Sequence, residues 1–172
     1  MAETSPAKVK VSQINQVAIA VKDLQMVAEN YWNILGIGPW EIYDWEEPLV
    51  HDRTYHGRPA WAREKLAKAR AGEVELELVQ PVEGDSIYQD FLTERGEGLD
   101  HLKFAVDDVH KTVEILAKQG FANLQSGRVG SPEYNAAYAY IDIKPLRAIW
   151  EFSSIQKGKS LNDMGIKSRR FP

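Results

Sequence analysis

The chain has 172 residues, a formal net charge of −4 at pH 7 and 44% hydrophobic residues, which suits one domain or two small modules sharing a core. Its mild acidity argues against nucleic acid or an anionic membrane as the main partner, and no apolar run could span a membrane. Cysteine is absent, which excludes disulfides and thiolate metal sites. Because residues 1–10 also lack the apolar core of a signal peptide, we expect a cytoplasmic protein with a disordered start at 1–10.

Residues 14–24 and 99–109 are two copies of one pattern, a face-alternating strand that leads into a helix. Gln16 in the first copy stands where His101 stands in the second. Asp23 and Asp108 are the expected caps of the two helices. A repeat of this kind predicts two copies of one structural module.

The first module is predicted over residues 11–82. Its opening strand is followed by a helix that Gly36 ends, and then by a strand at 40–45. Residues 46–59 are polar and contain two prolines and a glycine, so we expect a loop over a site.

Residues 61–71 are ambiguous. Their Ala, Lys, Glu and Arg content favours a helix. The repeat instead requires a strand joined by a hairpin to the alternating strand at 73–80. We predict the strand.

Residues 83–98 are predicted to link the modules and to carry a short helix near 86–95. The second module, residues 99–155, repeats the first; after the helix at 109–119, its strands are expected at 124–129, 136–143 and 148–153. Residues 156–172 are polar and basic, which predicts a C-terminal tail or an arm that contacts a partner.

The predicted fold class is therefore α+β, with two βαβββ modules that form a curled mixed sheet around a shared metal cleft, helices outside. Strand alternation puts Gln16, Glu77, His101 and Glu151 on the cleft side. An ionised carboxylate inside a sheet is costly unless it is paired or binds metal. A pseudo-twofold axis between the modules would bring these four residues together, and we call them the quartet. Their mainly oxygen donors suit a divalent ion such as Zn, Ni, Co, Mn or Mg.

These features resemble the vicinal oxygen chelate (glyoxalase/bleomycin resistance/dioxygenase) superfamily over residues 14–153. Residues 14–21, 76–81, 85–92 and 98–102 are most similar to methylmalonyl-CoA epimerase-like members. The resemblance implies that the quartet occupies the metal positions, and that the metal chelates substrate oxygens and stabilises an oxyanion or enolate.

For an epimerase, the resemblance implies that Glu151, or second Glu77, removes the proton next to a carbonyl. The epimerases place another acid or base in the loop after their first module's second strand, where this chain has His56 among other candidates. We therefore expect a divalent-metal-dependent isomerase, epimerase or lyase. Candidate substrate-binding residues are Lys103, Trp45, Trp61 and Tyr140.

Two departures bear on the reaction. The Gln-Glu-His-Glu set is similar to zinc-type glyoxalase I, but Ala20 and Pro81 replace the arginine and asparagine that those enzymes place near their first two ligands. Glutathione chemistry is therefore disfavoured. Of the two His and one Glu that hold iron in ring-cleaving dioxygenases, only His101 and Glu151 match.

The alternatives are a glyoxalase-like or dioxygenase-like enzyme on a small oxygenated substrate, which the tryptophans would allow to be aromatic, and a non-catalytic binding protein of the same fold. Zn, Ni, Co or Mn is the expected metal, with iron compatible with a dioxygenase. The expected partner is an acyl thioester or a small oxygenated acid. The resemblance also allows a homodimer.

Overall fold

The computed structural model describes residues 6–11, 13–131, 134–155, 161–162 and 165–171. In this part of the chain, eleven strands form one sheet, accompanied by three α-helices and one 3-10 helix. The elements are β1 (Gln16–Ala20), α1 (Leu24–Leu35), β2 (Trp40–Trp45), β3 (Val50–Tyr55), β4 (Arg58–Pro59), β5 (Ala62–Ala71), β6 (Val74–Gly84), α2 (Ile87–Arg95), β7 (Gly98–Ala105), α3 (Val109–Ala117), β8 (Ala122–Ser131), β9 (Tyr134–Ile143), η1 (Lys144–Leu146), β10 (Ala148–Ser153) and β11 (Arg169–Phe171).

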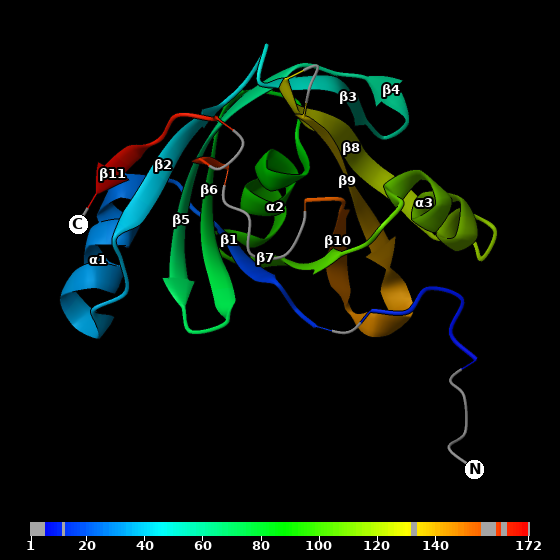
Figure 1. Cartoon of the computed structure of the whole chain (residues 1–172), viewed down its shortest axis with the longest axis horizontal. Helices are drawn as coiled ribbons and strands as arrows, with labels where there is room; N and C mark the ends of the chain where they lie inside the picture. The colour runs from blue at the N-terminus through cyan, green and yellow to red at the C-terminus, as the bar shows by residue number, and fades with distance from the viewer. Residues whose placement is uncertain (1–5, 12, 132–133, 156–160, 163–164, 172) are drawn as a thin grey trace.

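The two predicted modules form the two halves of this sheet. The strand order is β11-β2-β5-β6-β1-β7-β10-β9-β8-β3-β4, with β1 and β7 antiparallel at the centre. Each of these strands runs parallel to the last strand of its own module, β6 or β10. The halves are therefore β1-α1-β2-β5-β6 and β7-α3-β8-β9-β10, which confirms the α+β fold of paired βαβββ units. Figure 1 shows α1 and α3 at the two flanks and α2 between them.

The outer faces of both halves are apolar and are covered by the helices. One cluster, which includes Leu24, Trp40 and Leu78, packs under α1, and another, with Phe104 and Phe152, packs under α3. Both helices begin at the expected aspartates. Asp23 accepts a hydrogen bond from the Met26 N–H at 3.0 Å, and Asp108 accepts one from the Lys111 N–H at 2.9 Å. Burial of these faces leaves the concave face of the sheet for the site.

Residues 62–71 form β5, as the repeat requires and against their helix propensity. This strand pairs with β6 along its whole length, and Ala67 and Ala69 are buried against α1. Tertiary pairing and burial therefore outweigh the local helix preference. The linker helix α2 also forms, and Ser86 caps it by accepting a hydrogen bond from the Gln89 N–H.

The predicted loop over residues 46–59 is wrong, because this segment contains the hairpin of β3 and β4. Strand β3 leaves the first module and pairs with β8, the outer strand of the second. Val50 and Arg53 on β3 are buried. Gly57 makes the turn, and Pro59 lies on the last strand of the sheet, where its missing N–H is tolerated.

The C-terminal residues partly pack back onto the chain. Strand β11 pairs antiparallel with β2, at the other edge of the sheet. Leu161 and Ile166 are buried in the cluster that fills the concave side, next to Tyr43 and Trp45. The segment expected to be a tail or a partner-contacting arm therefore contributes to the fold of its own chain. Residues 156–160, 163–164 and 172 lie outside the described residues.

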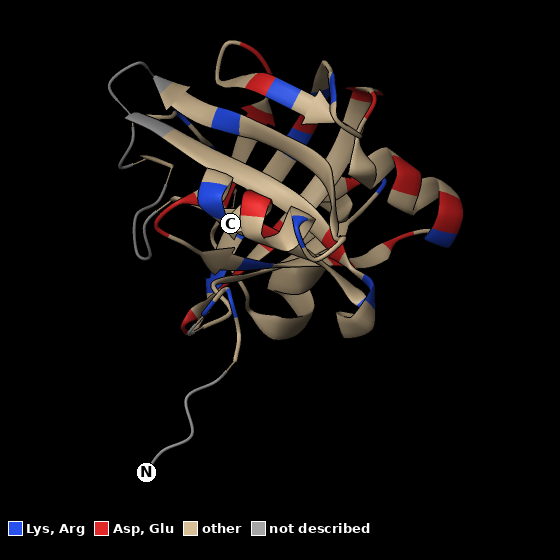
Figure 2. Ribbon diagram, turned by 90° about the vertical axis from the view of Figure 1, so that its right-hand side faces the viewer, with Lys and Arg blue, Asp and Glu red and all other residues tan. Residues whose placement is uncertain are grey.

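No helix among the described residues has the length and apolar character needed to span a bilayer. Acidic and basic residues are interspersed over the ribbon rather than separated by sign (Figure 2). Several charged side chains, among them Arg53, Glu64 and Lys68, are nevertheless buried.

A buried ion pair joins segments from opposite ends of the strand order. Arg53 on β3 donates two hydrogen bonds of 2.9 Å to the carboxylate of Glu64 on β5. Their side chains are 4% and 0% exposed. Burial lowers the pKa of Arg53, but the interactions with Tyr138 and Glu64 outweigh this effect, so the net shift of the pKa is upward. Arg53 thus attaches the inserted hairpin to the first module while the rest of β3 pairs with the second.

We predict that Arg53→Met destabilises the fold by about 3–5 kcal/mol, because it leaves the Glu64 carboxylate buried without a partner. Urea unfolding at neutral pH measures this loss. Arg63→Met is the matched control, since Arg63 is 44% exposed and pairs with the exposed Glu83. It should cost no more than about 1 kcal/mol. Equal losses in the two variants would contradict the structural role of the Arg53 pair.

Candidate active site

The structure brings the four residues of the quartet together on the concave face. Gln16, Glu77, His101 and Glu151 come from the four central strands and are each at most 5% exposed. In the strand register, Ala18 is the partner of both Glu77 and His101. The Ala18 side chain is only a methyl group, so no larger side chain separates the two.

His101 is the centre of this cluster. Its Nε2 atom lies 3.2 Å from Oε2 of Glu151 and 3.7 Å from Oε2 of Glu77. Its Nδ1 atom lies 2.8 Å from Oδ1 of Asp100, which is also buried. Burial lowers the pKa of His101, but the contacts with Asp100 and Glu151 outweigh it and raise the pKa to about 9. Without a metal, the ring is therefore a cation between two carboxylates at neutral pH.

Two lysines add positive charge beside the quartet. Lys68 Nζ lies 3.0 Å from Oε1 of Glu77 and 3.4 Å from Oε1 of Glu75. Lys103 Nζ lies 3.7 Å from the same Glu75 atom. Burial lowers the pKa of Lys68, but Glu75 and Glu77 outweigh it, so the pKa is raised and the ammonium stays charged.

The same cations keep the carboxylates ionised. Burial raises the pKa of Glu151, but Lys103 and His101 outweigh it and the net shift is downward. Burial likewise raises the pKa of Glu75, yet Lys68, Lys103 and a hydrogen bond from Gln16 bring it down to about 2. Glu151 is thus a buried, ionised carboxylate at neutral pH, which is what a base inside a site requires.

The quartet offers the type of donor atoms that a divalent ion requires. Gln16 donates through Nε2 to Glu75 at 2.5 Å and to Glu77 at 3.2 Å, which leaves its Oε1 atom buried without a hydrogen-bond partner. His101 Nε2 makes no well-aligned hydrogen bond, although it lies 3.2 Å from Glu151. An unpaired buried atom such as the Gln16 oxygen points to a missing partner.

The geometry, however, is not that of a formed metal centre. In the part of the chain that the structure describes, no group of three or more His, Asp or Glu side chains is arranged to hold a metal ion. Lys68 also competes for Glu77. The case for a metal ion therefore rests on the chemistry of the four donor residues and on the unpaired oxygen of Gln16.

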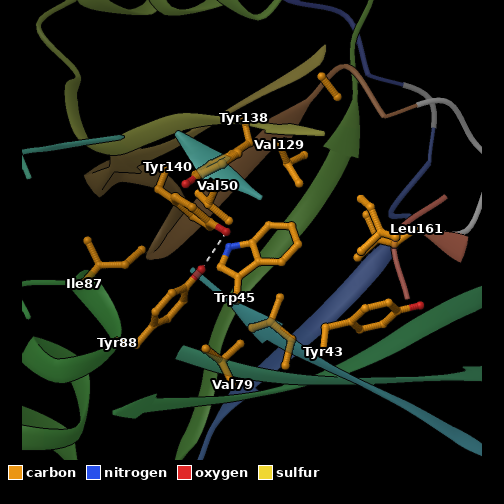
Figure 3. Packing of buried hydrophobic residues seen from close by; sticks show 13 residues of the cluster. Tyr43, Trp45, Val50, Val79, Ile87, Tyr88, Val129, Tyr138, Tyr140 and Leu161 are labelled. Atoms are coloured by element: carbon orange, nitrogen blue, oxygen red, sulfur yellow. Dashed lines mark hydrogen bonds between the residues drawn. The ribbon is translucent and has the colours of Figure 1, made fainter. Parts of the chain in front are cut away.

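Aromatic side chains form the wall opposite the charges. The Tyr140 ring packs edge-on against His101, with 4.9 Å between ring centroids. The Tyr88 hydroxyl donates to the Tyr140 hydroxyl at 2.6 Å, and burial raises the pKa of both well above the usual value. Figure 3 shows the Trp45 indole among these tyrosines, with Leu161 from the C-terminal segment nearby. These two tyrosines stay neutral and, with Trp45, limit the access of water.

The other candidate residues divide into two groups. Lys103, Trp45 and Tyr140 lie on the concave face around the quartet. His56 does not, because its segment is a hairpin and not a loop over the cleft. His56 lies at the hairpin turn with a half-exposed side chain, where it contacts Tyr55 and Asp90. Trp61 is 45% exposed and is not part of the wall.

No role for Lys68 was predicted from the sequence, and the structure places this residue beside Glu77. The hairpin register puts Lys68 directly opposite Glu77 on the same side of the sheet. Once Glu77 is assigned to the cleft, this register is the signal that would have placed Lys68 there too.

Comparison with known proteins agrees with this architecture. The sequence model of the Glyoxalase/Bleomycin resistance protein/Dioxygenase superfamily matches residues 15–138. The uncharacterized protein YqjC of Bacillus subtilis (strain 168) is 26% identical over 108 residues, which cover 63% of this chain and 67% of YqjC.

The fold is also found in solved structures, including those of two other proteins. The hypothetical protein BH1468 from Bacillus halodurans C-125 has a TM-score of 0.61 at 20% identity, over 86% of this chain and 97% of that one. A variant of the Streptomyces coelicolor methylmalonyl-CoA epimerase, in complex with 2-nitronate-propionyl-CoA, has a TM-score of 0.59 at 21% identity, over 84% and 97% of the two chains.

The shifted pKa of Glu75 predicts a specific acid sensitivity of the metal-free protein. A carboxyl whose pKa falls from 4.5 to about 2 on folding stabilises the fold above pH 4.5, and this contribution is lost as the pH falls toward 2. Wild type should therefore lose about 2 kcal/mol more than Glu75→Gln between pH 7 and pH 3. Urea unfolding after chelator treatment tests this. Glu83→Gln, at an exposed position, should behave like wild type, and identical pH profiles for wild type and Glu75→Gln would contradict the assignment.

Proposed function

This chain belongs to the Glyoxalase/Bleomycin resistance protein/Dioxygenase superfamily, and from that premise we propose that it is a divalent-metal-dependent isomerase, epimerase or lyase. Its reaction removes a proton next to the carbonyl or carboxylate of an acyl thioester or a small oxygenated acid. The observation that carries the proposal is the buried pair of Glu77 and Glu151, one from each module, which face the same nitrogen of His101.

Glu151 is the proposed base. It is buried, and Lys103 and His101 keep it ionised because they lower its pKa. A general base must be ionised at the working pH to accept a proton, and Glu151 meets this condition at neutral pH.

Glu77 is the proposed second group. It lies on the symmetry-related strand, and its Oε2 atom is within 3.7 Å of the same His101 nitrogen. A substrate carbon between the two carboxylates could lose its proton to Glu151 and regain one on its other face from Glu77, which must carry a proton before this step. The centre is then inverted, and proton exchange with water restores both groups. If only one of them acts, the outcome is a simple isomerisation or an elimination.

Gln16, Glu77, His101 and Glu151 are the residues that would hold the metal. When bound, a divalent ion would supply Lewis-acid stabilisation of the negative charge that develops on the substrate oxygen. Lys68 and Lys103 add fixed positive charge near that position, and the Tyr88–Tyr140 pair orients neutral hydroxyls on the aromatic side.

A non-catalytic small-molecule binding protein of the same fold is the second candidate. The contact of Lys68 with Glu77 favours it, because the lysine already neutralises one carboxylate of the quartet. Such a protein would bind its ligand tightly without metal, whereas the enzyme requires the metal for turnover.

The metal itself is the first test. We predict close to one equivalent of Zn, Ni, Co or Mn in the purified or reconstituted protein, and loss of most of it in Glu151→Ala. Elemental analysis on folded protein, checked by circular dichroism, measures this. Glu83→Ala controls for removal of an exposed carboxylate. If the wild-type protein took up no metal after reconstitution, the proposal of a metal-dependent enzyme would be contradicted. The proposal of a non-catalytic binding protein would remain.

Proton exchange is the second test. We predict that the metal-loaded protein exchanges the α-proton of acyl thioesters, or of 2-oxo or hydroxy acids, with D₂O. Glu151→Gln should slow this exchange by about 10²–10⁴-fold, the usual contribution of a general base. NMR follows the exchange, and metal content measured on the same sample separates loss of the base from loss of the ion. An unchanged rate in Glu151→Gln would assign the base elsewhere.

A further inference from the structure

A polar cavity of about 370 Å³ lies beside the quartet, on the side of the first module. We name it the Arg170 cavity; its lining includes Glu41, Lys68, Arg70, Glu75 and Arg170. In the register of β11 with β2, Arg170 is the partner of Glu41. The C-terminal strand therefore supplies one wall of the cavity.

The charges in this cavity are unbalanced in favour of cations. Both carboxylates that line it are already engaged. Glu41 accepts hydrogen bonds of 2.7 Å from Tyr43 and from Asn162, and Glu75 accepts from Gln16 and contacts Lys68.

The two arginines are not engaged in the same way. Within the described residues, neither Arg70 nor Arg170 makes a side-chain hydrogen bond or a short ion pair, and both are exposed, although the charge of Arg70 helps to lower the pKa of Glu75. Guanidinium groups present paired donors that match the two oxygens of a carboxylate or phosphate. A cavity in which two guanidinium groups have unused donors and the carboxylates are already hydrogen-bonded has the chemistry of an anion site.

Lys68 connects this cavity with the quartet. It lines the cavity, it is only 9% exposed, and its Nζ atom is 3.0 Å from Oε1 of Glu77. A group bound in the cavity is thus separated from the proposed reaction centre by little more than one side chain. We propose that the Arg170 cavity binds an anionic group, a carboxylate or a phosphate, at the end of the substrate away from the carbon that loses its proton.

This inference rests on the proposed function for the reacting end, and it narrows the substrate class. The anionic group must lie only a few bonds from the reacting carbon. In a coenzyme A thioester, the whole pantetheine arm separates the acyl group from the nearest phosphate. A compact acid with a second carboxylate or a phosphate therefore fits the cavity, and the coenzyme A phosphates do not.

The test is equilibrium binding of succinate, of inorganic phosphate and of coenzyme A to the metal-free full-length chain, by isothermal titration calorimetry. Arg170→Gln and Arg70→Gln should each weaken binding of the anion by about tenfold or more, as expected for loss of a charge-assisted hydrogen bond. Binding of succinate alone indicates a carboxylate, and binding of phosphate alone indicates a phosphate ester.

Arg169→Gln is the matched control. Arg169 is exposed on the same strand, its register partner is Ile42 rather than Glu41, and it does not line the cavity. It should change the affinity by less than about twofold, because a solvent-exposed charge that does not contact the bound anion is screened. An equal loss in Arg169→Gln would mean general attraction of anions and would overturn the proposal.

Three other results would overturn it as well. One is that neither succinate nor phosphate binds the wild type. Another is that binding depends on Arg147, which lines a separate cavity of about 400 Å³ next to Asp100 and His101. The third is that only coenzyme A binds through Arg170. Because no metal or turnover enters this measurement, its failure is distinct from failure of the proposed reaction.

Discussion

The structure depends on one constraint: the carboxylates on the concave face are buried, and each needs a positive partner. Glu64 has Arg53, Glu77 has Lys68 and His101, and Glu151 has His101 and Lys103. A carboxylate left alone in such a place would be strongly destabilising. The concave side also has an apolar cluster, around Tyr43, Trp45 and Leu161, so the buried charges are not needed to fill it. Together with the apolar faces under α1 and α3, this cluster supplies the stability that the buried charges require.

The pseudo-twofold relation between the modules is kept in the backbone and broken in the side chains. Lys68 lies opposite Glu77, and Tyr140 lies opposite Glu151, at equivalent positions of the two hairpins. The strand position paired with Glu77 in its hairpin is thus a lysine, whereas the one paired with Glu151 is a tyrosine, although both carboxylates lie near His101 and near a lysine. Two carboxylates in different surroundings can take different roles in one reaction. A strictly symmetric cleft would make them equivalent and could not assign one to remove a proton and the other to return it.

The features that could be predicted from the sequence were the repeated modules and the patterns within single strands and helices. Two copies of one strand–helix pattern identified the modules, and alternation along each strand placed the quartet on one face. The sequence could not predict pairings between segments far apart in the chain. The hairpin of β3 and β4 looked like a loop because β3 pairs with β8, more than seventy residues away. The same pairing places His56 at the hairpin turn, where it contacts Tyr55 and Asp90.

The two elements that the sequence did not predict have a common effect. Strand β3 pairs with the outer strand of the second module, and β11 pairs with the outer strand of the first. The sheet therefore ends in the short strands β11 and β4 rather than in the longer β2 and β8, and short edge strands offer less backbone for pairing with other chains. Strands β3 and β11 each also bring an arginine: Arg53 neutralises Glu64, and Arg170 enters the wall of the cavity beside Lys68. Both β10, which carries Glu151, and β11 lie beyond residues 15–138, the part that matches the superfamily. In the proposed function, the paired modules hold the reaction centre, and the strands added at their edges change the charge around it.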